Sequence, residues 1–390
     1  MTSINLQRRT LLQYGFMALG IFVGNSWLSP VLRAAPLTLG ALKPADHNGL
    51  RLPDGFTSRI VARSGQAQFG YIWHVAPDGG ATFATSEGGW IYVSNSEADN
   101  AAGGVGALRF NSRGAVIGAY PVLTHSNRNC AGGSTPWGTW LSCEETDRGR
   151  VWECDPFGVN AAQLRLALGL FKHEAATVDT KNKQLYLTED EPDGCLYRYT
   201  SYSFDAHGDP DLNDGMLEVA QVIDGVIGLV RWHRVPDPSA RSLPTRKQVE
   251  RCTHFNGGEG IWYHDGIVYF TTKGDDRIWA YQVRNQHLSI LYNAALFTWP
   301  VLTGVDNIIG NTGGDLFVAE DKGNMQIVAI SGNKIAPIVQ VMGHNSSEIT
   351  GPAFSPDGSR LYFSSQRGTT GRMEDGVTFY AVQNTNGLFA

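Results

Sequence analysis

Acidic residues recur at two places in a repeated pattern along this chain. The first set directly follows short apolar segments, in Cys143-Glu144-Glu145, Glu189-Asp190, Gly274-Asp275-Asp276 and Glu320-Asp321. The second set precedes neighbouring segments and comprises Glu174, Glu259, Asp306 and Glu348. Carboxylates gathered in one place repel one another and take up protons unless a cation neutralises them. Because carboxylate oxygens are hard ligands, the two sets predict a site for calcium or a similar cation.

One stretch of the sequence adds a softer ligand to these acids. Residues 129–145 combine glycine turns, two tryptophans and the sequence Cys143-Glu144-Glu145. A thiolate beside two carboxylates is electrostatically unfavourable unless a cation lies there. A thiolate with carboxylates suits a transition metal such as iron better than calcium. The alternative is that Cys143 is a small buried apolar residue, which is common for cysteine.

The elements that must position these acids are short strands. Six strand-sized apolar segments each carry one aromatic residue that marks the repeat: Tyr92, Trp140, Tyr186, Tyr269, Phe317 and Tyr362. Successive markers are 48, 46, 83, 48 and 45 residues apart, so the long interval holds one repeat and an insertion. A period of this size with about four strands per unit is typical of a β-propeller. We therefore predict an all-β protein, a β-propeller of about six blades.

Tight turns explain why the two sets of acids are expected to meet. Turn dipeptides such as Asn182-Lys183, Asp265-Gly266 and Asp357-Gly358 lie between the two sets. Such dipeptides close hairpins, and a hairpin brings its two outer ends together. Repeated around a ring, this arrangement predicts a carboxylate cluster at one mouth of the central channel.

Several cationic side chains fall near the same strand ends. They are Lys172, Lys273, Arg277 and Arg367, with His173 and His254 close by. The cations could bind an anionic substrate or pair with the carboxylates, and a lone histidine is more often a hydrogen-bonded structural residue than a ligand.

Length and charge limit the domain organisation and the partners. The chain has 390 residues, of which 42% are hydrophobic, and its formal net charge is −6. Because a propeller shares its core around the ring, we predict one domain over residues 36–390, with an insertion around 201–255. No run of Lys or Arg is present, which argues against nucleic-acid binding.

The N-terminus reads as a targeting segment. Arg8-Arg9 precede a short apolar stretch at 14–23, and Ala34-Ala35 offer a cleavage region. Residues 1–35 therefore resemble a twin-arginine signal peptide, with a Sec signal or a membrane anchor as alternatives. The stretch is short and interrupted by glycine, so no stable membrane insertion is expected. The predicted partner is the twin-arginine export machinery, and the predicted location is periplasmic or secreted.

Five cysteines are present: Cys130, Cys143, Cys154, Cys195 and Cys252. An odd number in an exported chain leaves at least one unpaired, and Cys143 is the natural exception. The other four could form two disulfides, whose connectivity the sequence does not specify.

Several of these segments resemble the PhoX-type alkaline phosphatase family. The resemblance is strongest over residues 129–145 and continues through Phe171-Lys-His-Glu-Ala175, Leu187-Thr-Glu-Asp190, Gly258-Glu-Gly260, Asp306-Asn307 and Glu348-Ile-Thr-Gly-Pro352. It implies a β-propeller phosphomonoesterase with an iron–calcium cluster at the channel mouth. It also implies that Cys143, Glu144, Glu174 and Glu259 bind iron, and that Asp190, Asp306 and Glu348 help to hold calcium.

The chain departs from the larger members of that family at two places. They have arginine two residues before the glutamate that matches Glu259, where this chain has Gly257, and their Gln-His-Pro-Gly is Gln366-Arg367-Gly368 here. Lys273 or Arg367 could take over phosphate binding, so the resemblance makes these two the candidate catalytic residues. The expected function is an exported, metal-dependent hydrolase of phosphate monoesters. The alternatives are a calcium-dependent lactonase or esterase and a non-catalytic calcium-binding propeller.

Overall fold

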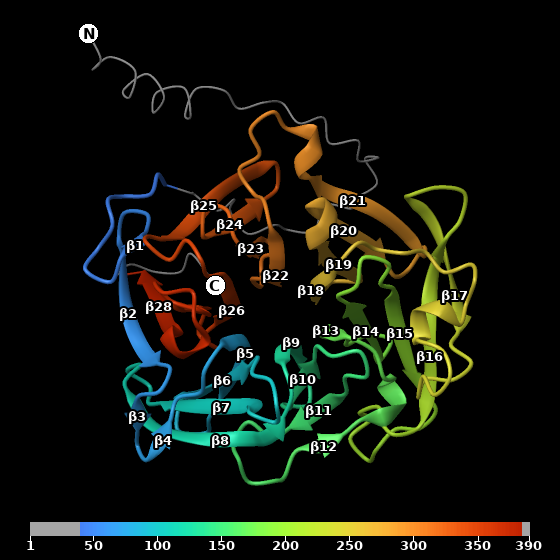
Figure 1. The fold of residues 1–390 in the computed structure, drawn as a ribbon, viewed down its shortest axis with the longest axis horizontal. Coiled ribbons are helices and arrows are strands. Elements are labelled where there is room, and N and C mark those ends of the chain that lie inside the picture. Colours follow the sequence, from blue (N-terminus) through green and yellow to red (C-terminus); the bar gives the residue numbers. More distant parts are fainter. Residues whose placement is uncertain (1–39, 384–390) are drawn as a thin grey trace.

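The computed structural model describes residues 40–383, whose strands form six blades around a central channel (Figure 1). Blade 1 is β5–β8, blade 2 is β9–β12, blade 3 is β13–β16, blade 4 is β18–β21, blade 5 is β22–β25, and blade 6 is β26–β28 with β2. Blades 3 and 4 share one nine-stranded sheet because β17 (Gly228–Arg234) pairs with both β16 and β21. The predicted all-β propeller of about six blades is confirmed.

Each blade is an antiparallel meander of four strands. The innermost strands are β5 (Pro77–Ala84), β9 (Asn129–Ser134), β13 (His173–Asp179), β18 (Gly258–His264), β22 (Val305–Gly310) and β26 (Ile349–Phe354). The second strands are β6 (Trp90–Ser96), β10 (Trp140–Glu144), β14 (Gln184–Glu189), β19 (Ile267–Thr272), β23 (Leu316–Glu320) and β27 (Arg360–Ser365). The third strands are β7 (Gly103–Phe110), β11 (Val151–Cys154), β15 (Leu196–Ser201), β20 (Arg277–Gln282), β24 (Gln326–Ser331) and β28 (Val377–Gln383). The outermost strands are β8 (Val116–Ser126), β12 (Gln163–Leu164), β16 (Gly215–Val222), β21 (His287–Asn293), β25 (Lys334–Val341) and β2 (Phe56–Arg63).

The two ends of the described chain close the ring. β2 pairs along β28, so an early strand completes the last blade. Three short strands lie outside the meanders: β1 (Leu50–Arg51) on β25, and the hairpin of β3 (Ala67–Gln68) and β4 (Tyr71–Ile72). The helical turns are η1 (Leu166–Leu168), η2 (Thr245–Lys247), η3 (Lys273–Asp275), η4 (Ala294–Leu296) and η5 (Met373–Asp375). None of the helices in residues 40–383 is long and apolar enough to cross a membrane.

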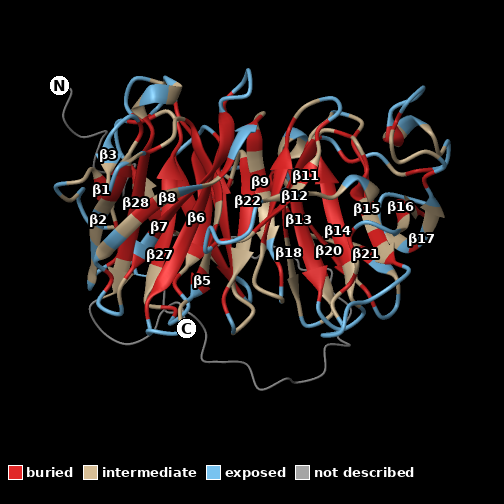
Figure 2. Cartoon of the chain, turned by 90° about the horizontal axis from the view of Figure 1, so that it is seen from below, coloured by how far each residue is buried: buried red, intermediate tan, exposed pale blue. Residues whose placement is uncertain are grey.

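The core lies between the blades, and the marker aromatics supply much of it. All six markers fall in the second strand of a blade, and Tyr92, Tyr186, Phe317 and Tyr362 have no exposed surface. Tyr92 of blade 1 stacks on Tyr362 of blade 6 with ring centroids 4.9 Å apart. Each blade-to-blade interface holds one such apolar cluster, which explains the buried band through the middle of the molecule (Figure 2). The repeated aromatic position is therefore a packing position.

The segment around 201–255 is only partly an insertion. Its first half contains β16, the ordinary outer strand of blade 3, and the added part is β17 with the residues that return to β18. The predicted signal peptide, residues 1–35, lies outside the described residues.

Candidate metal centre

Blades 1 to 5 share one break in strand pairing at the same end of the channel. In each, the first residue of the innermost strand pairs with the second strand, and then two residues oppose one. Such a β-bulge bends a strand and re-aims its side chains. The first residue of each bulge carries a ligand atom: Asp78, Cys130, Glu174, Glu259 and Asp306. The bulges therefore explain why ligand groups from five blades converge.

Blade 6 has no ligand residue in its bulge, and the reason is steric. Its bulge falls at Gly351-Pro352, and a Cβ at Gly351 would lie 2.4 Å from the carbonyl oxygen of Asp78. The φ of Gly351 is +58°, which L side chains rarely adopt. Blade 6 instead contributes Glu348, which precedes β26 and forms a β-bridge with Asp321.

The alternation of side chains decides which acid at the end of a second strand faces the cluster. Three acids are paired last residues of these strands: Glu144, Glu189 and Glu320. They point away from the cluster, since Glu144 binds Arg150 at 2.7 Å and Glu189 accepts from Tyr197 at 2.8 Å. The following residue points to the opposite side. That position holds Glu97, Glu145, Asp190, Lys273 and Asp321 in blades 1 to 5.

Ligand atoms from neighbouring blades come close enough to share cations. Four groups of three residues each have their ligand atoms within 4.8 Å of one another. They are Asp78–Glu97–Cys130, Cys130–Glu145–Glu174, Glu174–Glu259–Asp306 and Asp306–Asp321–Glu348. Each group shares a residue with the next, so the groups form one continuous arc, which we call the mouth cluster.

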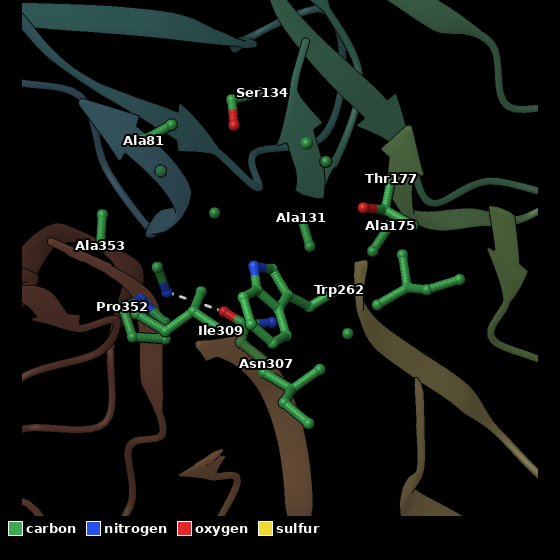
Figure 3. Close-up of a pocket in the computed structure, with 18 of the residues that line it drawn as sticks. Ala81, Ala131, Ser134, Ala175, Thr177, Trp262, Asn307, Ile309, Pro352 and Ala353 are labelled. Carbon is green, nitrogen blue, oxygen red and sulfur yellow. Dashed lines mark hydrogen bonds between the residues drawn. The ribbon is translucent and has the colours of Figure 1, made fainter. Parts of the chain in front are cut away.

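A cavity of about 240 Å³ lies in the channel next to the mouth cluster and is lined mainly by the innermost strands. Figure 3 shows small side chains such as Ala81, Ala131 and Ala175 around it, with the indole of Trp262 among them. Glycine directly follows two of the ligand residues here. A Cβ on Gly79 would lie 2.5 Å from the Cα of Ala131, and one on Gly260 would lie 2.5 Å from the backbone nitrogen of Ile308. These glycines let adjacent innermost strands approach closely enough for the ligand groups to meet.

Four cationic side chains border the mouth cluster. Arg128 bridges Glu97 at 2.5 Å and Glu145 at 2.8 Å, and Lys172 lies 2.8 Å from Glu145 and 3.2 Å from Asp190. Lys273 lies 2.7 Å from Glu259 and 3.5 Å from Asp321, and Arg367 lies 2.8 Å from Glu348. Nine carboxylates and one thiol thus face four cations, which leaves a negative excess that bound metal would neutralise.

The titration of the carboxyl groups reflects this excess. Burial, followed by the charge of Glu145, raises the pKa of Glu97 to about 8. Burial and neighbouring charges raise the pKa values of Asp306 and Glu348 to about 7. Burial also tends to raise the pKa of Glu145, but Lys172 and Arg128 outweigh it and lower the value to about 2. Burial, then Asp78 and Glu174, raise the pKa of the Cys130 thiol.

Three buried carboxylate oxygens in the cluster have no hydrogen-bond donor: Glu174 Oε2, Glu259 Oε1 and Asp321 Oδ1. Glu259 Oε1 does form the 2.7 Å ion pair with Lys273, but without hydrogen-bond geometry. A buried carboxylate oxygen without a donor is costly. Glu174 Oε2 and Asp321 Oδ1 are therefore open to a cation, and Glu174 also contacts the Cys130 thiol.

The structure brings most of the predicted site residues together and separates two of them. Glu174, Glu259, Asp306 and Glu348 belong to the mouth cluster, and Asp190, Lys273 and Arg367 border it through ion pairs. Cys143 lies elsewhere, in the apolar cluster between blades 2 and 3 with Leu141, Val151 and Leu185. Glu144 is bound by Arg150, Trp152 and Ser126. Neither residue belongs to the mouth cluster.

Sequence reasoning overlooked several residues of the cluster. They are Asp78, Glu97 and Cys130, and also Glu145, for which Glu144 was chosen, and Asp321, which belongs to the first set of acids but was not chosen as a ligand. The spacing between each acid and the aromatic marker of its blade would have identified two of these residues. The acids of the second set precede their marker by 10 to 14 residues, and Cys130 precedes Trp140 by 10 while Asp78 precedes Tyr92 by 14.

We expect protein stripped of metal by a chelator to lose stability as the pH rises. Folding raises the pKa of Glu97 to about 8 and those of Asp306 and Glu348 to about 7, so the folded chain holds more protons than the unfolded chain between pH ~4.5 and ~8. The free energy of unfolding then falls by up to about 1.4 kcal/mol per pH unit for each such proton. Thermal unfolding of chelated protein at pH 5.5, 7 and 8.5 measures this slope.

A variant provides the control for this prediction. Glu97→Gln removes one titrating group, so the chelated variant is expected to lose less stability between pH 5.5 and 8.5 than the chelated parent. Equal melting temperatures of the chelated parent at all three pH values would contradict the charge excess described above.

Comparison with known proteins identifies relatives of this fold. Residues 118–163 and 147–289 match the family model described as Alkaline phosphatase PhoX. The structure of Pseudomonas fluorescens PhoX in complex with vanadate, a transition state analogue, aligns with a TM-score of 0.72 and 17% identity. That alignment covers 90% of this chain and 98% of the other. A Bacteroides thetaiotaomicron protein of unknown function aligns with a TM-score of 0.53 and 7% identity, over 87% and 83% of the two chains.

At these identities the structural likeness concerns the fold. A comparison with curated protein sequences gives no match. The family-model match lies on blades 2 to 4, which hold Cys130, Glu145, Glu174 and Glu259 of the mouth cluster. The matched residues, 118–289, make up less than half of the chain, so the comparisons show a resemblance to the PhoX alkaline phosphatase family model over blades 2 to 4 and a shared propeller fold.

Proposed function

We propose that this chain is an exported phosphomonoesterase that hydrolyses phosphate esters at an iron–calcium cluster held by the mouth of the propeller. The observation that carries the proposal is the donor set itself. A single thiol lies among converging carboxylates from neighbouring blades, in a part of the chain that matches the PhoX family model. A lactonase or a calcium-binding propeller has no use for that thiol.

The donor chemistry divides the mouth cluster into two parts. Cys130, Glu145 and Glu174 combine a soft thiolate with carboxylates, which suits iron. The two groups that share Asp306 contain only carboxylates, which suits calcium. In this proposal Cys130 and Glu145 take the roles that the sequence suggested for Cys143 and Glu144.

The cationic side chains would bind the substrate. When bound, the metals supply Lewis acidity toward the phosphoryl oxygens. Ligation would draw on Glu259, Asp321 and Glu348, so Lys273 and Arg367 would be freer to bind the phosphate dianion. Lys273 retains 33% and Arg367 31% of its side-chain exposure, so both are accessible from the mouth. Their fixed positive charges would orient the ester and offset charge that develops on the transferring phosphoryl group.

Position in the fold supports this role for Lys273. It occupies the place in blade 4 at which blades 1, 2, 3 and 5 carry an acid. Its backbone nitrogen donates to the carbonyl oxygen of Gly257 at 2.8 Å. Gly257 is the position at which larger family members carry arginine. A Cβ on Gly257 would lie 3.9 Å from the Cβ of Lys273, so the Lys273 side chain starts beside the position that the arginine side chain would occupy.

Export is the remaining part of the proposal. Arg8-Arg9 and the apolar stretch after them support a twin-arginine signal over residues 1–35, and a periplasmic or secreted enzyme. The twin-arginine route carries folded proteins, which would allow the cluster to be loaded before export.

The test is elemental analysis of the full chain, exported by its host and purified without chelators, with hydrolysis of p-nitrophenyl phosphate measured on the same sample. We expect iron and calcium in a fixed ratio, and activity that chelation abolishes and the two metals restore. Calcium without iron, with hydrolysis of a lactone instead, would favour the lactonase alternative. Tightly bound calcium, with no turnover of p-nitrophenyl phosphate or of the lactone, would favour the non-catalytic calcium-binding propeller.

A further inference from the structure

Two cysteines outside the mouth cluster lie side by side, although 57 residues separate them in the chain. Cys195 directly precedes β15 of blade 3, and Cys252 lies in the added segment that leads back to β18. Their Sγ atoms are 3.4 Å apart, and both residues are buried, at 2% and 9% exposure. A disulfide requires about 2.05 Å, so a shift of roughly 1.4 Å would join them. Cys130, Cys143 and Cys154 show no such neighbour within residues 40–383.

A histidine is positioned to activate one thiol of the pair. The Nδ1 atom of His254 lies 2.7 Å from the carbonyl oxygen of Asp193, which can only accept, so Nδ1 carries the proton. The Nε2 atom of the neutral ring is then an acceptor, and it lies 3.9 Å from Cys252 Sγ. His254 itself is exposed, so a reagent in solution can reach this side of the pair.

The surroundings distinguish the two thiols. The Cys195 thiol donates to Cys252 Sγ, and this hydrogen bond, opposed by burial and aided by the charge of Lys247, lowers the pKa of Cys252. The same hydrogen bond and burial raise the pKa of Cys195. Low-pKa, reachable cysteines are the ones that attack a disulfide first. Cys252 is also the less buried of the two and lies 3.9 Å from Nε2 of the exposed His254, so we assign it as the attacking thiol and Cys195 as the resolving one.

We propose that Cys195 and Cys252 form a redox-active pair that closes to a disulfide and fastens the added segment onto blade 3. Cys252 thiolate attacks one sulfur of an oxidising disulfide, such as oxidised glutathione, and releases one thiolate. Cys195, on losing its proton to solvent, displaces the second thiolate from the mixed disulfide. Two thiols are oxidised, one disulfide is reduced to two thiols, and no other reactant is needed.

The disulfide would reinforce contacts that already hold this segment. Phe255 N donates to Gly194 O at 2.8 Å, and Gly257 N donates to Glu191 O at 2.9 Å. Arg246 contacts Glu189 at the end of β14, and Glu191 and Asp193 in the loop before Cys195. The covalent bond would therefore close a loop that contains β15, β16, β17 and η2, and would remove chain entropy from the unfolded state.

The test uses the full chain, first reduced and desalted, then exposed to oxidised glutathione. After alkylation and digestion without reductant, we expect one cross-linked peptide pair that contains Cys195 and Cys252, with the other three cysteines alkylated. Oxidised protein is expected to melt about 5 °C higher than reduced protein. Separate alkylation of Cys195 and Cys252, or linkage of either to another cysteine, would overturn the proposal.

Variants separate the disulfide from a metal site and from general effects of losing a thiol. Cys195→Ala and Cys252→Ala should each abolish the redox-dependent shift in melting temperature, whereas Cys154→Ala should keep it. His254→Ala should slow closure about tenfold at pH 7 and leave the final linkage unchanged. A different result would show a metal site instead of a redox pair. In that case the reduced protein binds stoichiometric zinc, keeps it in the presence of oxidised glutathione, and loses it in His254→Ala. The cross-link on the parent chain decides the matter even if a variant fails to fold, and it does not depend on phosphatase activity.

Discussion

Replacing Cys130 with alanine is expected to abolish iron binding and to lower kcat/KM for p-nitrophenyl phosphate at least about 100-fold. Within residues 40–383, Cys130 supplies the thiol that belongs to the mouth cluster, where it donates to Glu174 Oε1 at 3.3 Å. Its loss leaves carboxylates alone, and these do not select iron over calcium. Iron and calcium contents measured beside the kinetics report the result, and calcium is expected to be largely retained.

Cys143→Ala is the matched control for this experiment. The two cysteines lie in the same blade, 13 residues apart, and Cys143 has no exposed surface. Cys143 packs among apolar side chains, so its replacement should cost about 1 kcal/mol of stability and leave iron content and activity unchanged. Loss of iron in Cys143→Ala with retention in Cys130→Ala would show that Cys143, and not Cys130, binds the iron.

Lys273→Met is expected to lower kcat/KM by about 100- to 1,000-fold while the iron and calcium contents stay near those of the parent. Methionine keeps most of the length and the apolar packing of the side chain but removes the charge that lies 2.7 Å from Glu259. The loss should fall mainly on kcat, because a charge that offsets transition-state charge acts less on the ground state. Steady-state kinetics and elemental analysis of the same preparation measure both effects.

Lys322 provides the control for Lys273, because it contacts the same carboxylate, Asp321, but is exposed to solvent. Lys322 lies 3.9 Å from Asp321 Oδ2 and is 82% exposed, whereas Lys273 lies 3.5 Å from that same atom. Lys322→Met should therefore change kcat/KM less than about twofold, as expected for a solvent-screened pair. A Lys273→Met protein that loses its metals would show that the residue only balances cluster charge. Unchanged activity with metals retained would assign phosphate binding to other cations.

The repeated pattern of the sequence was sufficient to predict the propeller architecture of this protein. The aromatic markers recur because each second strand must present a large apolar side chain to the next blade, and a closed ring repeats that demand at a fixed interval. The same logic located Glu174, Glu259, Asp306 and Glu348, since a hairpin brings its outer ends together whatever the rest of the fold does. The spacing to the marker would also have identified Asp78 and Cys130.

Only the tertiary structure decided which member of each adjacent pair faces the channel. Glu144 and Glu145, or Glu320 and Asp321, are neighbours of similar chemistry, and a strand sends them to opposite sides. Their direction depends on where the strand begins and where its bulge falls, and a shift of one residue exchanges them. The proximity of Cys195 to Cys252 likewise depends on the path of the added segment over blade 3. Sequence therefore determined the ring and the mouth where its acids gather, whereas strand register and chain path determined which side chains meet there.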